Sequence, residues 1–135
     1  IRASLKDLGL NKAVLMAREI AELDPYLKVN VFTDGLTADN MEDFFGRSSP
    51  IDVLVDECDS LSMKLQMRQM AKTKRIPVVM ETSDRGMLDI ERFDLEPDRP
   101  LFHGRIANLP WESFLANPSQ ELGFQLLTSI VDVAQ

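Results

Sequence analysis

Two short and almost wholly apolar segments, separated by a stretch of helical length, limit most strongly what this chain can fold into. They are residues 51–56 and residues 77–80, and residues 61–73 lie between them with helical periodicity. Strands this apolar are typical of a parallel sheet buried between helices. Parallel neighbours are usually joined by a helical crossover. The pattern therefore predicts an α/β protein.

The residues before this unit continue the alternation of helix and strand. Asn11 is placed to cap a helix that runs to about Leu23. Residues 28–32 alternate between polar and apolar side chains and predict a strand. Thr37 is placed to cap a short helix that ends near residue 45. We therefore expect a three-layer, Rossmann-like fold with a mostly parallel sheet.

The pattern changes after the second apolar segment. Residues 86–93 predict one more strand, with Leu88 and Ile90 facing inward. Residues 94–104 form a proline-rich loop, and one helical turn is expected near Trp111. Ser119 is expected to cap a last helix, and four apolar residues share one face of it: Leu122, Leu126, Ile130 and Val133. We expect residues 1–93 to form the Rossmann-like portion, and 94–135 to belong to the same domain or to begin a following region.

Composition excludes several classes of function. The chain has 135 residues, a formal net charge of −7 and one cysteine. The negative charge argues against a nucleic-acid partner, and one cysteine excludes a cysteine-rich zinc site. No apolar run is long enough for a membrane span, and the first residues do not form a signal peptide. These features favour a cytoplasmic protein without a membrane partner.

The residues directly after the first apolar segment are the best candidates for chemistry. Ligands bind beyond the carboxyl ends of parallel strands, where Asp56, Glu57 and Asp59 place three carboxylates within four residues. Carboxylate oxygens together with phosphate oxygens suit Mg²⁺. The structural alternative is that Asp59 or Ser60 only caps the following helix. A second polar group, residues 81–86, follows the next strand.

Three further residues have a chemical and a structural interpretation each. Lys12 begins the first helix, where its ammonium can reach a phosphate, although most such lysines are ordinary surface residues. Cys58 lies beside two acids that raise the pKa of a thiol, so a small buried thiol is the better interpretation. His103 stands alone, without a catalytic or metal-binding motif. The chain also contains no Gly-x-Gly-x-x-Gly or Walker loop.

Five sequence segments, taken in order, carry a family resemblance. They cover about two thirds of the chain and lie at residues 8–13, 21–29, 36–40, 52–60 and 76–79. In this order they resemble the second half of the adenylation domain of the ThiF/MoeB/HesA family, which is related to ubiquitin-activating enzymes. The resemblance implies that the glycine-rich half of the fold is absent and that the parent is a longer protein. It also implies that the parent is an ATP-dependent adenylyltransferase and that this chain alone has little activity.

The resemblance also implies roles for individual residues. Lys12 is similar to the lysine that contacts the phosphates of ATP, and Asp59 to the aspartate that holds Mg²⁺. Asp56 is similar to the acid that closes the strand and is a second candidate for the metal. The family's Asp-Asn pair appears here as Asp59-Ser60, and Lys64 stands in place of its downstream arginine. We take Ser60 and Lys64 as further nucleotide-binding positions.

Partners and relatives of the parent follow from the same resemblance. The acceptor would be the C-terminal carboxylate of a ubiquitin-like or sulfur-carrier protein, and the parent would be a homodimer. The paired Cys-x-x-Cys motifs of the family's zinc site are missing, so no zinc is expected. Some members of the superfamily carry a nitroreductase-like domain further along the chain.

Two other functions remain open on the sequence alone. A dinucleotide-dependent oxidoreductase that binds NAD or FAD could have a similar half-domain. A non-catalytic interaction module could keep the fold without the chemistry, and the departures at Ser60 and Lys64 favour that possibility. The two alternatives differ from the adenylyltransferase in the ligand that the intact protein would bind.

Overall fold

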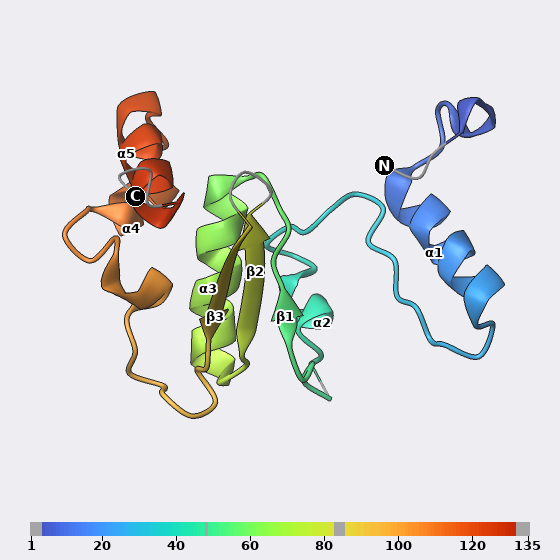
Figure 1. Ribbon diagram of the computed structural model, residues 1–135, viewed down its shortest axis with the longest axis horizontal. Helices are drawn as coiled ribbons and strands as arrows, with labels where there is room; N and C mark the ends of the chain where they lie inside the picture. The colour runs from blue at the N-terminus through green and yellow to red at the C-terminus, as the bar shows by residue number, and fades with distance from the viewer. Residues whose placement is uncertain (1–3, 48, 83–85, 132–135) are drawn as a thin grey trace. The chain divides into compact units, whose positions relative to one another are not determined.

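The computed structural model describes residues 4–47, 49–82 and 86–131, and the chain divides into two compact units. The first unit is Ile1–Phe44 and the second is Phe45–Gln135. Figure 1 shows the elements of both units along the chain. All strands of the described residues belong to the second unit.

The first unit holds one long helix. A 3-10 turn, η1 (Leu5–Asp7), precedes helix α1 (Lys12–Leu23), and a short helix α2 (Met41–Phe44) closes the unit. The predicted cap of α1 is confirmed, because the side chain of Asn11 accepts a hydrogen bond of 2.9 Å from the backbone of Ala13. The predicted short helix is also present, although it begins later than Thr37.

The strand expected at residues 28–32 is absent. These residues run without regular secondary structure and pair with no strand in the described part of the chain. Val29 is 41% exposed and Val31 is 38% exposed, so their side chains do not face a packed core. Alternation of side chains indicates a strand only where a neighbour accepts its backbone hydrogen bonds and covers one face, and neither condition is met here.

The second unit is built on a three-stranded sheet in the order β1 (Leu54–Val55), β2 (Val78–Thr82), β3 (Met87–Glu91). β1 and β2 are parallel and are joined by helix α3 (Leu61–Lys74), as the sequence predicts. β2 and β3 are antiparallel. The described sheet is therefore mixed rather than mostly parallel. The physical reason is the short connection between β2 and β3, because a parallel crossover needs about a dozen residues.

The face of β3 that points inward is the reverse of the predicted one. Leu88 is 62% exposed and Ile90 is 45% exposed, whereas Asp89 and Glu91 are buried. Helix α3 lies along one face of the sheet (Figure 1). β3 turns its acids inward because α3 presents a buried arginine, Arg68, to receive them.

The remaining regular elements described in the second unit are helices. Beyond the 3-10 turn η2 (Leu101–Gly104) come helices α4 (Trp111–Ala116) and α5 (Gln120–Val131). The predicted cap of α5 is confirmed by a hydrogen bond of 3.3 Å from the backbone of Leu122 to the hydroxyl of Ser119. Leu126 and Ile130 are buried on the predicted face of α5, whereas Val133 lies outside the described residues. None of the described helices is both long and apolar enough to cross a membrane.

Candidate functional site

The loop between β1 and α3 carries the acidic residues that the sequence singles out. Its start is fixed to the sheet, because the backbone N–H of Asp56 donates 2.8 Å to the carbonyl of Val79 on β2. Its end is fixed to the helix, because the hydroxyl of Ser60 accepts from the backbone of Met63 at 3.4 Å and caps α3. The intervening residues, including Asp59, are held between these two anchors at the carboxyl end of β1.

Asp56 is fully buried and both of its carboxylate oxygens are taken by protein groups. Oδ1 accepts from Nζ of Lys64 at 3.0 Å and from the backbone N–H of Cys58 at 3.2 Å, and Oδ2 contacts the guanidinium of Arg68. Burial alone would raise the pKa of Asp56, but the charges of Arg68 and Lys64 outweigh it and hold that pKa below its ordinary value. The geometry makes Asp56 a structural anchor, which leaves Asp59 as the metal candidate of this loop.

Arg68 lies on α3, fully buried, and joins β1 to β3. Its Nε donates a hydrogen bond of 2.7 Å to Glu91, and its terminal nitrogen lies 3.6 Å from Oδ1 of Asp89. The guanidinium carbon also lies 4.1 Å from the centre of the Phe102 ring, within cation–π range. The backbone N–H of Phe102 donates 2.6 Å to the other oxygen of Glu91. One arginine thus compensates three buried carboxylates.

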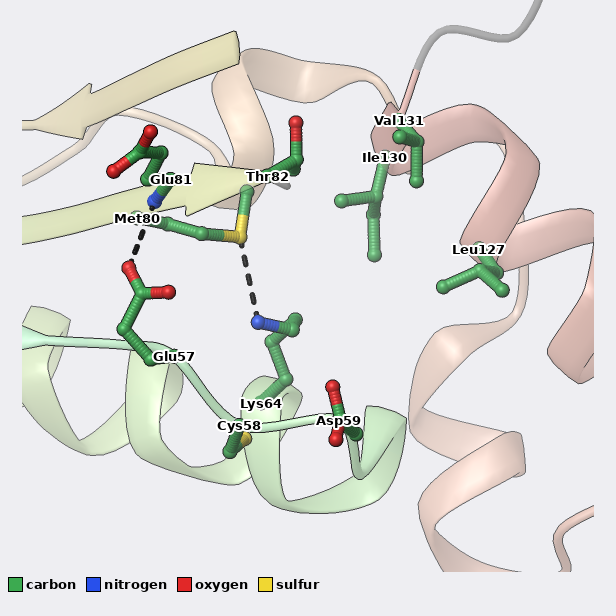
Figure 2. Close-up of a pocket in the computed structure, with 10 residues that line it drawn as sticks. All are labelled: Glu57, Cys58, Asp59, Lys64, Met80, Glu81, Thr82, Leu127, Ile130 and Val131. Atoms are coloured by element: carbon green, nitrogen blue, oxygen red, sulfur yellow. Dashed lines mark hydrogen bonds between the residues drawn. The ribbon is translucent and has the colours of Figure 1, made fainter. Parts of the chain in front are cut away.

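A pocket of about 330 Å³ opens at the carboxyl ends of β1 and β2. Figure 2 shows that one side is polar and comes from the loop after β1, from α3 and from the end of β2. Across from Lys64 and Asp59, helix α5 supplies an apolar side. Ten residues line the pocket: Glu57, Cys58, Asp59, Lys64, Met80, Glu81, Thr82, Leu127, Ile130 and Val131.

The polar side of the pocket combines acids with one ammonium group. Glu57 accepts a hydrogen bond of 3.1 Å from the backbone N–H of Glu81. Lys64 has only 11% of its side chain exposed, and it also donates to the sulfur of Met80 at 3.4 Å. The carboxylate of Asp59 is exposed and has no hydrogen bond or ion pair within the described residues. It is therefore available to a ligand in the pocket that it lines.

The family resemblance implies a magnesium ion, and the side chains of this loop are compatible with one way of binding it. No group of three His, Cys, Asp or Glu side chains in the described ranges is arranged to hold a metal. Mg²⁺ often takes only one or two carboxylates, together with waters and substrate phosphates. Asp59 would fit that mode of binding if a phosphate ligand supplied further oxygen atoms.

Cys58 lines the same pocket but is not built for nucleophilic chemistry. Burial, followed by the nearby charge of Asp56, raises the pKa of its thiol to about 11. A thiol with this pKa is almost wholly protonated at neutral pH. Cys58 is half-buried rather than fully buried as the sequence predicts, and its raised pKa agrees with a thiol that is a poor nucleophile.

The structure brings three of the predicted nucleotide-binding residues together. Asp59, Ser60 and Lys64 lie within one turn of the β1–α3 junction, in the second unit. Lys12 is exposed at the first turn of α1, in the first unit. Sequence reasoning missed Arg68 and the side chains of α5. Arg68 could have been noticed because it lies in a helix expected to pack on a sheet. A buried charge there is rarely left unpaired, so its presence indicates acidic partners.

Fold and pocket together define an α/β protein with an acidic candidate ligand site at the carboxyl ends of two parallel strands. The model of the ThiF family matches residues 1–103, so the chain belongs to the ThiF family. Helix α5, which supplies the apolar side of the pocket, lies beyond the matched residues. No solved structure gave a significant match.

Two curated relatives are similar to the chain. The "Uncharacterized protein MT1398" of Mycobacterium tuberculosis (strain CDC 1551 / Oshkosh) is 50% identical over 103 residues, which are 76% of this chain and 14% of the relative. The "tRNA threonylcarbamoyladenosine dehydratase" of Escherichia coli (strain K12) is 29% identical over 89 residues, which are 66% of this chain and 32% of the relative. The chain thus spans a third or less of the length of either relative.

Proposed function

We propose that the protein containing this chain is an ATP-dependent adenylyltransferase that activates a carboxylate. The observation that carries the proposal is the loop after β1 in a chain of the ThiF family. There Asp59, which has no partner among the described residues, and the buried Lys64 line one pocket. Such a reaction needs two groups at the nucleotide: a carboxylate that binds a metal ion, and a cation that contacts a phosphate.

The proposed reaction transfers the adenylyl group of ATP. An oxygen of the acceptor carboxylate attacks the α-phosphorus, and a new oxygen–phosphorus bond forms. The bond from the α-phosphorus to the oxygen bridging to the β-phosphate breaks, and pyrophosphate leaves with that electron pair. The protein contributes positioning and charge compensation rather than a covalent group, which agrees with the inert thiol of Cys58.

Each residue of the site has a proposed role in that reaction. Asp59 would hold Mg²⁺, which would neutralise negative charge on the phosphates. Lys64 would direct its remaining N–H toward a phosphate oxygen, while its other contacts stay with Asp56 and Met80. Ser60 would act mainly through its cap on α3. A phosphate contact by Lys12 stays a prediction from the family resemblance.

The acceptor we favour is the C-terminus of a small carrier protein of the ubiquitin-like or sulfur-carrier type, and we expect a homodimer. The name of the Escherichia coli relative refers to a modified tRNA. The net charge of −7 disfavours a large nucleic-acid partner here. We do not favour the NAD- or FAD-dependent alternative, because the matched family is ThiF.

Exchange of labelled pyrophosphate into ATP tests the proposal. The full gene product, supplied with Mg²⁺ and a carboxylate acceptor, should catalyse exchange that stops when Mg²⁺ is chelated. The chain alone should exchange little, because its sequence contains no glycine-rich phosphate loop. A full gene product that binds NAD or FAD and shows no exchange would contradict the proposal.

A further inference from the structure

We propose that Arg68 is a positioning residue of the candidate nucleotide site, acting on Lys64 through Asp56; this inference rests on the proposed function. Arg68 does not line the pocket, whereas Lys64 does. The two cations meet on one carboxylate, with Lys64 on Oδ1 of Asp56 and Arg68 on Oδ2. Asp56 is thus the shared link between them.

The position of Asp56 depends on Arg68 because little else holds its Oδ2. Within the described residues, that oxygen has only the guanidinium of Arg68 as partner. The guanidinium is held in turn by Glu91 and by the ring of Phe102. A planar guanidinium can satisfy these partners in different directions at once, and a lysine ammonium cannot match this geometry.

The position of Asp56 sets that of Lys64. The ammonium of Lys64 has three N–H donors, of which one goes to Asp56 at 3.0 Å and one to the sulfur of Met80 at 3.4 Å. If Asp56 turns away, the strongest of these contacts is lost and the long side chain of Lys64 gains rotamer freedom. The same carboxylate also accepts from the backbone of Cys58 and so shapes the loop that presents Asp59.

Kinetics of the full gene product test the proposal. Arg68→Lys should raise the KM for Mg·ATP by about tenfold, with a smaller change in kcat, because it disturbs ground-state phosphate contacts. Asp56→Asn, which keeps the volume of the side chain, should have the same effect and serves if Arg68→Lys does not fold. Arg92→Lys is the matched control, since Arg92 pairs with Asp94 at the surface.

A double-mutant cycle separates positioning from general loss of structure. Lys64→Met should raise the KM for Mg·ATP, and adding Arg68→Lys to it should raise the KM no further. A folded Arg68→Lys protein with an unchanged KM would overturn the proposal. The proposal would also be overturned if the effects of Arg68→Lys and Lys64→Met on KM were additive, or if Lys64→Met left the KM unchanged. Both outcomes can occur while pyrophosphate exchange still supports the proposed function.

NMR of the lysine ammonium groups tests the same link without any activity. In the native protein, Lys64 should give a slowly exchanging ammonium signal, because it is buried and bonded to Asp56. That signal should shift or vanish in Arg68→Lys and stay in Arg92→Lys. If no exchange of pyrophosphate is found, the proposed function fails, and an unmoved Lys64 signal would show separately that the positioning also fails.

Discussion

Nε of Arg68 donates a hydrogen bond of 2.7 Å to Oε2 of Glu91, and both side chains are fully buried. The pair joins α3 to β3 and turns an acidic strand face inward. Burial raises the pKa of Glu91, and the charge of Arg68 offsets this only in part. Removal of Arg68 would leave the carboxylate of Glu91 in the core without the cation that pairs with it, so the stability of the second unit depends on this pair.

Arg68→Ala should lower the free energy of unfolding by about 3–5 kcal/mol, because it removes the cation that contacts three buried carboxylates and leaves Glu91 without its arginine partner. Urea unfolding followed by circular dichroism measures the loss. Arg92→Ala removes an arginine whose side chain is 49% exposed and should lower the free energy of unfolding far less. Equal losses in the two variants would show that the buried cluster does not hold the fold together.

Asp56→Asn should show how the free energy of unfolding depends on pH. The pKa of Asp56 is lowered on folding, so its ionised form stabilises the native state above the ordinary value of 3.8. That stabilisation disappears as the pH falls through the lowered pKa. Native and Asp56→Asn proteins should therefore differ most in unfolding free energy near about pH 6, and the difference should shrink as the pH falls below 3.8. A constant or growing difference on acidification would contradict the sign of the shift.

Cys58 should react slowly with iodoacetamide. Its thiol pKa of about 11 lies roughly two units above the ordinary value of 9.0, so the thiolate fraction near neutral pH falls about 100-fold. Mass spectrometry of the folded and urea-unfolded chain should show at least that ratio of alkylation rates. Rates that agree within a few fold would place Cys58 in an open, unperturbed environment.

Ser60→Ala should cost about 1 kcal/mol of stability through loss of the cap on α3. Ser60→Asn restores a good capping side chain and introduces the asparagine that the family resemblance places there. It should therefore keep native stability in thermal unfolding. If Ser60→Ala is as stable as the native protein, the cap observed at α3 contributes nothing to folding.

The caps and helices of this chain could be predicted from local sequence. Asn11 and Ser119 cap helices as expected, and the helix expected at residues 61–73 is present as α3. Helix caps depend on a few adjacent residues, and helical periodicity on a single segment. The family and the acidic loop after β1 could also be inferred, since both depend on the order of short motifs.

The inward face of β3 could not be predicted from its own residues. Alternation fixes that Leu88 and Ile90 share one side and Asp89 and Glu91 the other, but it does not say which side is buried. The answer depends on Arg68, about twenty residues earlier, and on a ring at Phe102. The strand predicted at residues 28–32 was wrong for a related reason. A strand needs a neighbouring strand to pair with, and local sequence does not reveal that neighbour.

Binding of Mg·ATP to the full gene product, with and without Asp59→Ala, tests the central claim most directly. Titration calorimetry should show that Asp59→Ala weakens the Mg²⁺-dependent binding of ATP by about tenfold or more. Asp52→Ala removes an exposed aspartate at the other end of β1 and should change binding by less than about twofold. An Asp59→Ala protein that binds Mg·ATP as tightly as the native protein would contradict the proposed site.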